Sequence, residues 1–295
     1  MNVLSLFDGM SCGQIALKEL DIKVDKYYAS EVDKFAIEQT QLNFPNTIQL
    51  GDITKWREWD IDWSSIDLVI GGFCCQSFSM AGHQKGFDDE RGQLFFIFAD
   101  IISNVLKHNP KAKFLGENVK MAERHQAVIN NRLGLLPVEI NSSLVSAQNR
   151  VRLYWSNIKV KEVGLFGEKH TDIPQPKDRN IYLKDVLEEE VDDKYYLSDK
   201  MIKGLMNRPK TFDTFKPVPL TYNGKGGCLT ARMFKMGAQD NYINNNGIRR
   251  LTPTECARLQ TIPDWYKWEC SGTQQYKMLG NGWTVEVIKH IFSFI

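Results

Sequence analysis

Short apolar runs alternate with longer amphipathic stretches along roughly the first half of the chain. The runs at residues 2–7, 26–30, 47–50, 66–70 and 112–116 have the length of buried strands. The stretches that follow the first and fourth runs, at residues 13–20 and 92–108, have the periodicity of helices. Because strands that alternate with helices usually form a parallel sheet covered by helices, the pattern predicts an α/β fold.

Glycines and carboxylates follow the first three predicted strands. Gly9 and Gly13 are spaced i and i+4, so the G-x-G-x-x-G cradle of a dinucleotide site is incomplete, although a nucleoside can still approach the backbone. Glu31 ends the second strand at the position where such folds bind ribose hydroxyls. Asp52 and Ile53 follow the third strand. Each acid alone is typical of a helix cap, but three such strand ends in succession favour a nucleoside pocket.

A long polar loop, residues 71–91, separates the fourth strand from the next helix and contains the adjacent Cys74 and Cys75. Loops of this length are usually functional or disordered. The carboxyl edge of a parallel sheet is where ligands bind, so a thiol there is a candidate nucleophile. The alternative is a small buried hydrophobic residue, which is the commonest role of a free cysteine.

Two further groups of polar residues follow later strands. Glu117 comes directly after the strand at residues 112–116, where an apolar environment suits a carboxyl group that donates a proton, although a helix cap is the simpler role. Gln148, Arg150 and Arg152 would project to one face of a strand. That face fits a heterocycle carbonyl or a phosphate, and equally an exposed basic stripe.

Composition narrows the class of protein. A chain of 295 residues suits one large domain plus a smaller lobe. No signal peptide or membrane-spanning run is apparent, so we expect an intracellular, soluble protein. The six cysteines form no C-x-x-C pair and the five histidines are scattered, which predicts no metal site. Residues 194–250 hold eleven Lys and Arg against three Asp, so this segment is a candidate for phosphate contacts, or else a solvated basic surface.

Six segments, taken together and in order, resemble the motif set of DNA cytosine-5 methyltransferases. The resemblance covers residues 1 to about 158 and 249–295. It implies an α/β, Rossmann-like S-adenosylmethionine-dependent methyltransferase domain at residues 1–190 plus 277–295, with a smaller target-recognition domain and hinge at 191–276. Residues 226–232 are similar to a recurring element of that second domain. The six segments are FDGMSCG (7–13), GFCCQSFS (72–79), ENV (117–119), QNRVR (148–152), RLTPTECARLQ (250–260) and GNG (280–282).

The resemblance also implies a reaction, in which a methyl group passes from S-adenosylmethionine to C5 of cytosine in duplex DNA. Cys75 matches the nucleophile that adds to C6 of a flipped cytosine. Glu117 would bind N3 and the exocyclic amine, Arg152 would bind O2, and Arg150 would steady the closed loop and favour the thiolate. The cofactor residues would be Phe7, Gly9, Gly13, Glu31, Asp52, Ile53, Gly72 and Asn281, and the DNA contacts would include Gln76, Ser79, Arg232, Lys235 and Gln239.

Two positions depart from the family pattern. Cys74 stands where the family usually has proline, which changes the loop's rigidity and adds a second thiol. Trp283 stands where smaller residues are usual near the cofactor.

We expect a cytoplasmic enzyme from a bacterium or phage, acting as a monomer on duplex DNA without a metal ion.

Three other functions compete with this reading. A tRNA or other RNA cytosine-5 methyltransferase would share the scaffold, but the additional Cys-Phe-Thr signature of those relatives is absent. A non-catalytic DNA-binding relative would be expected to have lost Cys75 or Glu117, and both are present. A nicotinamide oxidoreductase is disfavoured by the incomplete glycine fingerprint.

Overall fold

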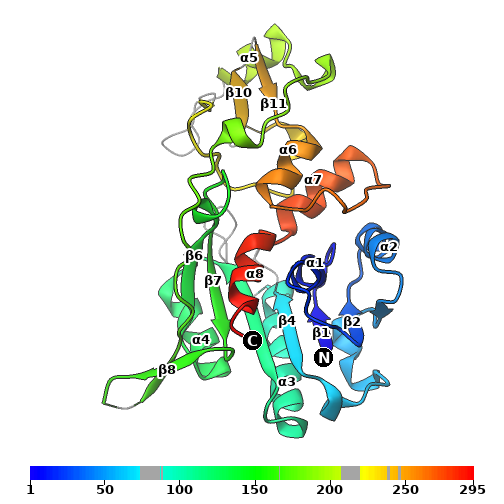
Figure 1. Ribbon diagram of the computed structural model, residues 1–295, viewed down its shortest axis with the longest axis vertical. Coiled ribbons are helices and arrows are strands. Elements are labelled where there is room, and N and C mark those ends of the chain that lie inside the picture. The colour runs from blue at the N-terminus through cyan, green and yellow to red at the C-terminus, as the bar shows by residue number, and fades with distance from the viewer. Residues whose placement is uncertain (74–86, 88, 166, 207–219, 238–239, 245–246) are drawn as a thin grey trace. The chain divides into compact units, whose positions relative to one another are not determined.

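The chain forms two compact units in the computed structural model, which describes residues 1–73, 87, 89–165, 167–206, 220–237, 240–244 and 247–295 (Figure 1). Unit 1 comprises Met1–Ile140, Val151–Gln175 and Val287–Ile295. Unit 2 comprises Asn141–Arg150 and Pro176–Glu286. The functional domains expected at 1–190 plus 277–295 and at 191–276 stay a prediction. No helix among the described residues is long and apolar enough to cross a bilayer.

A seven-stranded sheet carries unit 1, with strand order β3-β2-β1-β4-β5-β7-β6. The pairings of β1 with β2 and β4, of β2 with β3, and of β4 with β5 are parallel, while β7 runs antiparallel to β5. The structure therefore confirms the α/β fold with a mainly parallel sheet. The strands are β1 (Asn2–Leu6), β2 (Lys26–Ser30), β3 (Ile48–Gln49), β4 (Leu68–Gly72), β5 (Lys113–Val119), β6 (Val138–Asn141) and β7 (Val151–Ser156).

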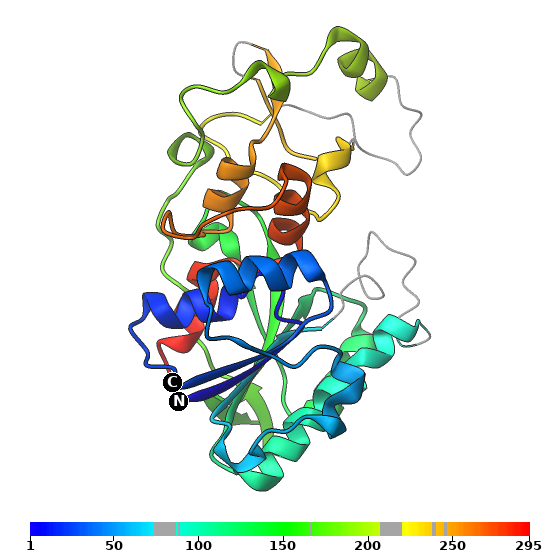
Figure 2. The same cartoon turned by 90° about the vertical axis from the view of Figure 1, so that its right-hand side faces the viewer.

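Helices cover both faces of this sheet (Figures 1 and 2). On one face the alternate residues Leu4, Val69, Phe114 and Trp155 join α3 and α4 in one apolar core. On the other, α8 is tied to α1 by an ion pair of Lys289 with Glu19, 3.6 Å apart. The helices of unit 1 are α1 (Cys12–Glu19), α2 (Lys34–Asn43), α3 (Glu90–His108) and α4 (Glu123–Leu133), joined by the latter part of α8 (Val285–Phe292), and a hairpin of β8 (Val160–Val163) and β9 (Glu168–Thr171) completes the unit.

The order of the strands creates a switch point between β1 and β4. The chain leaves β1 toward β2 and β3 on one side, and later adds β4 and β5 on the other. The segments that follow β1 and β4 therefore diverge, and in open α/β sheets ligands bind in the crevice at such a point. The candidate nucleoside turn follows β1, and the candidate nucleophile loop follows β4.

One predicted boundary is wrong at its carboxyl end. The strand expected at residues 112–116 extends to Val119, so Glu117 lies inside β5 rather than after it. The reason is the antiparallel partner β7, since Glu117 is opposite Tyr154 and Val119 is opposite Arg152.

Unit 2 is built from short elements around a buried ion pair. Nη2 and Nη1 of Arg249 donate to Glu255, at 2.7 and 2.8 Å, and neither side chain is exposed. Glu255 also accepts from the backbone N–H of Thr252 in a capping box, which fixes the start of α6. The elements are α5 (Asp199–Met206), the hairpin of β10 (Tyr242–Asn244) and β11 (Ile248–Arg250), α6 (Pro253–Leu259), α7 (Gly272–Asn281) and the 3₁₀ helix η7 (Met233–Lys235).

Close packing at Gly71 yields the first test of this fold. A Cβ on Gly71 would lie 2.8 Å from both Leu6 O and Phe98 Cε2, so backbone or a buried ring must move. We expect Gly71→Ala to lower the free energy of unfolding by about 1–3 kcal/mol, as overpacking does elsewhere. Gly204→Ala is the matched control, because no described atom lies within 4 Å of that Cβ and Ala favours a helix. Denaturant midpoints measure both, and an unchanged midpoint for Gly71→Ala would contradict the packing.

Candidate active site

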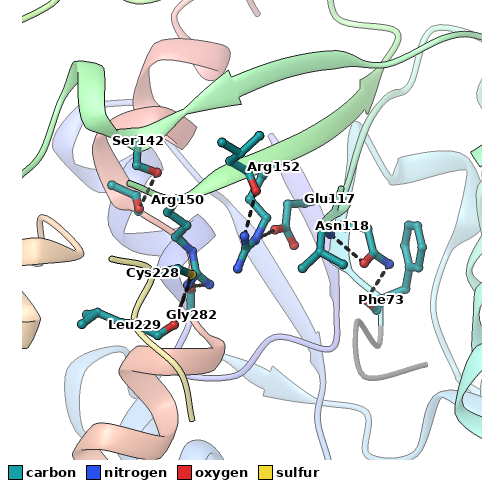
Figure 3. Close-up of polar contacts among 12 residues, drawn as sticks. Phe73, Glu117, Asn118, Ser142, Arg150, Arg152, Cys228, Leu229 and Gly282 are labelled. Carbon is teal, nitrogen blue, oxygen red and sulfur yellow. Dashed lines mark hydrogen bonds and ion pairs between the residues drawn. The ribbon is translucent and has the colours of Figure 1, made fainter. Parts of the chain in front are cut away.

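An ion pair between Glu117 and Arg152 lies near the carboxyl end of β5 (Figure 3). Arg152 Nε is 3.0 Å from Glu117 Oε1, and the two side chains are only 12 % and 10 % exposed. Arg152 Nη1 also donates to Val151 O at 2.8 Å, so the guanidinium has a second contact, with the backbone of its own strand. The register of the sheet thus brings together a carboxylate and an arginine that lie 35 residues apart in sequence.

The same register places the pair beside the start of the candidate nucleophile loop. Gly72, the last residue of β4, lies directly opposite Glu117. Cys74 and Cys75 come two and three residues after Gly72 in the sequence. Cys74, Cys75, Gln76 and Ser79 lie outside the described residues, as does the DNA-contact candidate Gln239.

Asn118 holds the chain just before that loop, a role that sequence reasoning missed. Its side chain is fully buried, and Nδ2 donates to Phe73 O at 3.1 Å. Its Oδ1 accepts from the Val119 N–H at 2.7 Å, so the amide orientation is defined from both ends. Phe73 is also fixed by ring contacts with Phe95 and Phe98, at 5.0 and 5.4 Å between centroids. The exit of β4 is therefore firmly anchored.

Arg150 does not share a strand face with Arg152, contrary to the sequence prediction. β7 begins only at Val151, because the Arg150 N–H donates to the Asn141 side chain instead of to a strand. Arg150 is 3 % exposed, and its guanidinium donates to Leu229 O, Gly280 O and Gly282 O at 3.0, 3.2 and 2.8 Å, and to Cys228 Sγ at 3.2 Å. Within unit 2 these bonds join the segment around Leu229 to the end of α7 (Figure 3).

Gln148, the third member of the predicted face, belongs to the same buried network. It accepts from the Leu229 N–H at 3.0 Å and donates to Leu259 O at 2.9 Å. Gln260, in turn, donates to Leu279 O and Gly282 O at 2.6 and 3.0 Å. A Cβ on Gly280 would overlap the backbone of Thr230 and Ala231. The recognition element, which we define as residues 226–235, is therefore packed directly onto the end of α7.

The turn after β1 is strained. Phe7, Gly9 and Ser11 have φ of 57°, 59° and 64°, and two of the three are not glycine. Such a conformation costs about 1–2 kcal/mol for a residue with a side chain, and strain of this kind concentrates at functional sites. No described atom lies within 4 Å of a Cβ built on Gly9, so the backbone there is open to a ligand.

The Glu31 carboxylate fixes this turn to the end of β2. Oε2 accepts from the Gly9 N–H at 2.8 Å, while Oε1 accepts from the Val32 and Asp33 N–H groups at 2.7 and 2.9 Å. A carboxylate has about four acceptor positions, so Oε2 can still accept from a hydroxyl group. Glu31 is therefore both a structural clamp and a candidate ribose ligand.

The remaining cofactor candidates lie at or near neighbouring strand ends in unit 1, with one exception. Asp52 caps η1 (Ile53–Glu58) by accepting from the Thr54 N–H at 2.9 Å, and Ile53 is buried against the core. Gly13 is buried in α1 and Gly72 ends β4. Asn281, the exception, is exposed at the end of α7 in unit 2. An open glycine turn flanked by Glu31 and Asp52 is a donor set that fits a nucleoside with free hydroxyl and amino groups.

The whole chain matches the model of one protein family. That family is described as C-5 cytosine-specific DNA methylase, and the match spans residues 1–295. The chain belongs to this family. Similar relatives include the Type II methyltransferase M1.ScrFI of Lactococcus lactis subsp. cremoris, at 36% identity over 98% of this chain and 76% of that protein. Another is M.HhaI of Haemophilus parahaemolyticus, at 30% identity over 99% of this chain and 93% of that one.

Solved structures of other methyltransferases have the same fold as this methylase. Spodoptera frugiperda DNMT2, in a mutant form, has a TM-score of 0.70 at 20% identity and covers 99% of this chain and 98% of its own. Entamoeba histolytica methyltransferase EhMeth has a TM-score of 0.70 at 16% identity, with 100% and 97% covered. The predicted Rossmann-like methyltransferase fold is confirmed. No cluster of His, Cys, Asp or Glu suited to a metal ion occurs in the described part of the methylase.

Asp8 is a second residue of the methylase whose role the sequence did not predict: it helps to hold the turn after β1. It lies in the strained turn, where Tyr27 Oη and Ser11 Oγ donate to its two oxygens at 2.9 and 2.7 Å. Burial raises the pKa of Asp8 from 3.8 to about 6, and the charge of Glu31 adds to this. The hydroxyl donor of Tyr27 comes from β2, so no local pattern in the sequence reveals the contact.

The raised pKa of Asp8 predicts a pH dependence of stability. The folded state holds the proton more tightly than the unfolded chain, so the stabilisation is complete below about pH 4 and is lost as pH rises through 6. The loss amounts to at most about 3 kcal/mol, from about 1.4 kcal/mol for each pKa unit. Unfolding free energies of wild type and Asp8→Asn at pH 4.5 and 7 test this. If both proteins change equally between the two pH values, Asp8 is not the group responsible.

The buried network predicts a strong effect of a conservative change at Arg150. A lysine ammonium cannot reach the three carbonyls that the planar guanidinium bonds, so Arg150→Lys should lower the free energy of unfolding by about 2–4 kcal/mol. Arg258→Lys is the matched control, since Arg258 is exposed and donates to one carbonyl, Val186 O at 3.2 Å. Chemical denaturation measures both. Equal losses in the two variants would show that the network is not what holds Arg150.

Proposed function

We propose that this methylase transfers a methyl group from S-adenosylmethionine to C5 of cytosine within a specific sequence of duplex DNA. The observation that carries the proposal is the Glu117–Arg152 pair, held opposite Gly72 where the chain leaves β4 toward Cys75. A carboxyl group, an arginine and a thiol are the three groups that activation of cytosine needs. The family match and the bacterial Type II relatives support the same reaction.

The chemistry follows from the weakness of C5 as a nucleophile. In our proposal the Cys75 thiolate forms a bond to C6, and the electron pair of the C5=C6 bond moves to C4=C5 as N3 takes up a proton, so that C5 becomes the nucleophilic carbon of an enamine. Glu117 hydrogen-bonds N3 and the exocyclic amine and supplies a proton to N3. Arg152 binds O2 and stabilises the charge that develops there. S-adenosylmethionine supplies the methyl group that C5 accepts. Solvent water then takes the C5 proton, the electron pair left behind restores the C5=C6 bond and expels the Cys75 thiolate, and N3 returns its proton to Glu117.

The strand ends of unit 1 are proposed to bind that cofactor. The open turn at Gly9 allows close approach, Phe7 lies against the adenine, and Glu31 and Asp52 accept from ribose hydroxyls and the adenine amine. Ile53, Gly13 and Gly72 shape the pocket. Asn281 is proposed to contribute from α7.

DNA is proposed to contact unit 2 and the loop that contains Cys75. Arg232 and Lys235 are both exposed on either side of Phe234, which suits contacts with phosphates or base edges. Gln76 and Ser79 are proposed to contact the duplex after the target base has flipped out. We further propose that Arg150 acts by holding the recognition element, that residues 191–276 form the target-recognition domain, and that the enzyme acts as a monomer in the cytoplasm.

Replacing Glu117 by glutamine tests the proposal directly. Gln keeps the shape but cannot supply the proton, so kcat for methylation of duplex DNA should fall about 10²- to 10⁴-fold. Glu123→Gln, at the exposed first residue of α4, is the matched control and should keep wild-type kcat. Formation of 5-methyldeoxycytidine, followed by mass spectrometry, measures both. Equal activity of the two variants, or methylation by the wild type of structured RNA but never of DNA, would contradict the proposed function.

A further inference from the structure

A pocket in unit 2 is lined by none of the residues assigned so far to catalysis, cofactor binding or DNA contact. Its volume is ≈ 340 Å³, and it is lined by Lys194, Tyr195, Phe234, Arg250, Tyr276 and the first turn of α7. Lys194 and residues 271–273 are exposed, so the pocket opens to solvent on that side. Two of its walls are cationic and three are aromatic. No carboxylate is among its lining residues.

Arg250 is the uncompensated charge of the pocket. Its guanidinium lies over the rings of Tyr195 and Tyr276, 5.2 and 5.6 Å from their centroids. Its Nε is buried without a hydrogen-bond partner, and within the described residues no carboxylate pairs with it. Its neighbour Arg249 also has a buried Nε without a partner, but its Nη1 and Nη2 both donate to the Glu255 carboxylate. When aromatic rings cover the faces of a guanidinium, its N–H groups still point outward along the edge and can donate to an anion.

Two other groups add to the positive potential. Lys194 is exposed, and Asp192 pairs with it at 2.8 Å, so it contributes less than Arg250. The first turn of α7 presents backbone N–H groups at Gly272 and Thr273, after Ser271 has capped Gln274. Such N–H groups and the helix dipole favour a negative charge in the same pocket.

The pocket adjoins the recognition element. Phe234, one of its walls, lies in η7 next to the exposed Lys235 and two residues after the exposed Arg232. These two cations are the proposed DNA contacts of unit 2. A duplex that meets them therefore passes the mouth of the pocket.

We propose that this pocket binds a backbone phosphate of the DNA substrate. The planar fork of Arg250 matches two phosphate oxygens, and the α7 N–H groups match another. Tyr195 and Phe234 then lie against the adjoining sugar. The inference rests on the proposed DNA methylation, and it extends the DNA interface to Arg250 and to the start of α7.

Salt dependence of DNA affinity tests this phosphate contact. The slope of log affinity against log salt decreases by about 0.9 for each phosphate contact that is lost. Arg250→Gln should lower the slope by about that amount and weaken binding about tenfold. Arg250→Lys keeps the charge and should keep most of the slope. Lys184→Gln, an exposed cation outside the pocket and the recognition element, is the matched control and should keep the wild-type slope.

A second variant separates binding from folding. Thr273→Asp places a negative charge at the exposed start of α7, where it favours the helix but repels a phosphate. We expect DNA affinity to fall while the unfolding midpoint stays at or above that of the wild type. A merely structural Arg250 predicts no loss of affinity in Thr273→Asp.

The outcomes distinguish this inference from the proposed function. If wild type binds and methylates duplex DNA while Arg250→Gln and Thr273→Asp keep its slope and affinity, the phosphate contact is overturned and the methylation stands. If wild type neither binds nor methylates DNA, the proposed function itself fails. Titration with inorganic phosphate tests whether the pocket binds a free anion instead. If wild type binds phosphate and Arg250→Gln does not, while the salt dependence of DNA affinity is the same in both, the DNA contact is overturned.

Discussion

The register of β1, β4, β5 and β7 is the constraint on which the candidate active site depends. Leu6 is opposite Gly71, Gly72 is opposite Glu117, and Val119 is opposite Arg152, so segments remote in sequence end at one edge of the sheet. A slip of one residue would turn Glu117 to the other face. Gly71 and Gly116 protect the arrangement, since a Cβ on either would press against the Phe98 ring. The chemistry is thus positioned by backbone pairing and a close helix contact.

Unit 2 is held together by buried polar bonds rather than by a large sheet. Arg249 with Glu255 fixes the start of α6, and Arg150 with Gln148 and Gln260 joins the recognition element to the end of α7. Buried hydrogen-bond networks of this kind define one arrangement of loops that have little secondary structure of their own. Arg150 therefore has a sufficient structural reason to be an arginine. Its proposed part in catalysis would be to keep the recognition element in place.

Local pattern located most of the sheet but not its cross-strand partners. The strand at residues 26–30 was predicted to the residue, and the alternation gave the order of β1, β2, β4 and α3. It ended β5 too early, because only the pairing with β7 extends that strand to Val119. The local pattern also placed Arg150 on a strand. In the structure the Arg150 N–H instead donates to the side chain of Asn141, nine residues earlier, and periodicity does not reveal such a contact. Asp8 was missed for the same reason, as its burial depends on Tyr27.

We propose that the Glu117–Arg152 pair serves a covalent reaction at Cys75, and this reaction can be examined by trapping the adduct between the protein and DNA. Wild-type protein, Cys75→Ala and Cys74→Ala are incubated with S-adenosylmethionine and duplex DNA that contains 5-fluorocytosine, which blocks loss of the C5 substituent and keeps the protein attached. We expect a denaturation-resistant adduct in wild type and Cys74→Ala, with the cross-linked peptide attached through Cys75. An adduct that persists in Cys75→Ala and disappears in Cys74→Ala would contradict it.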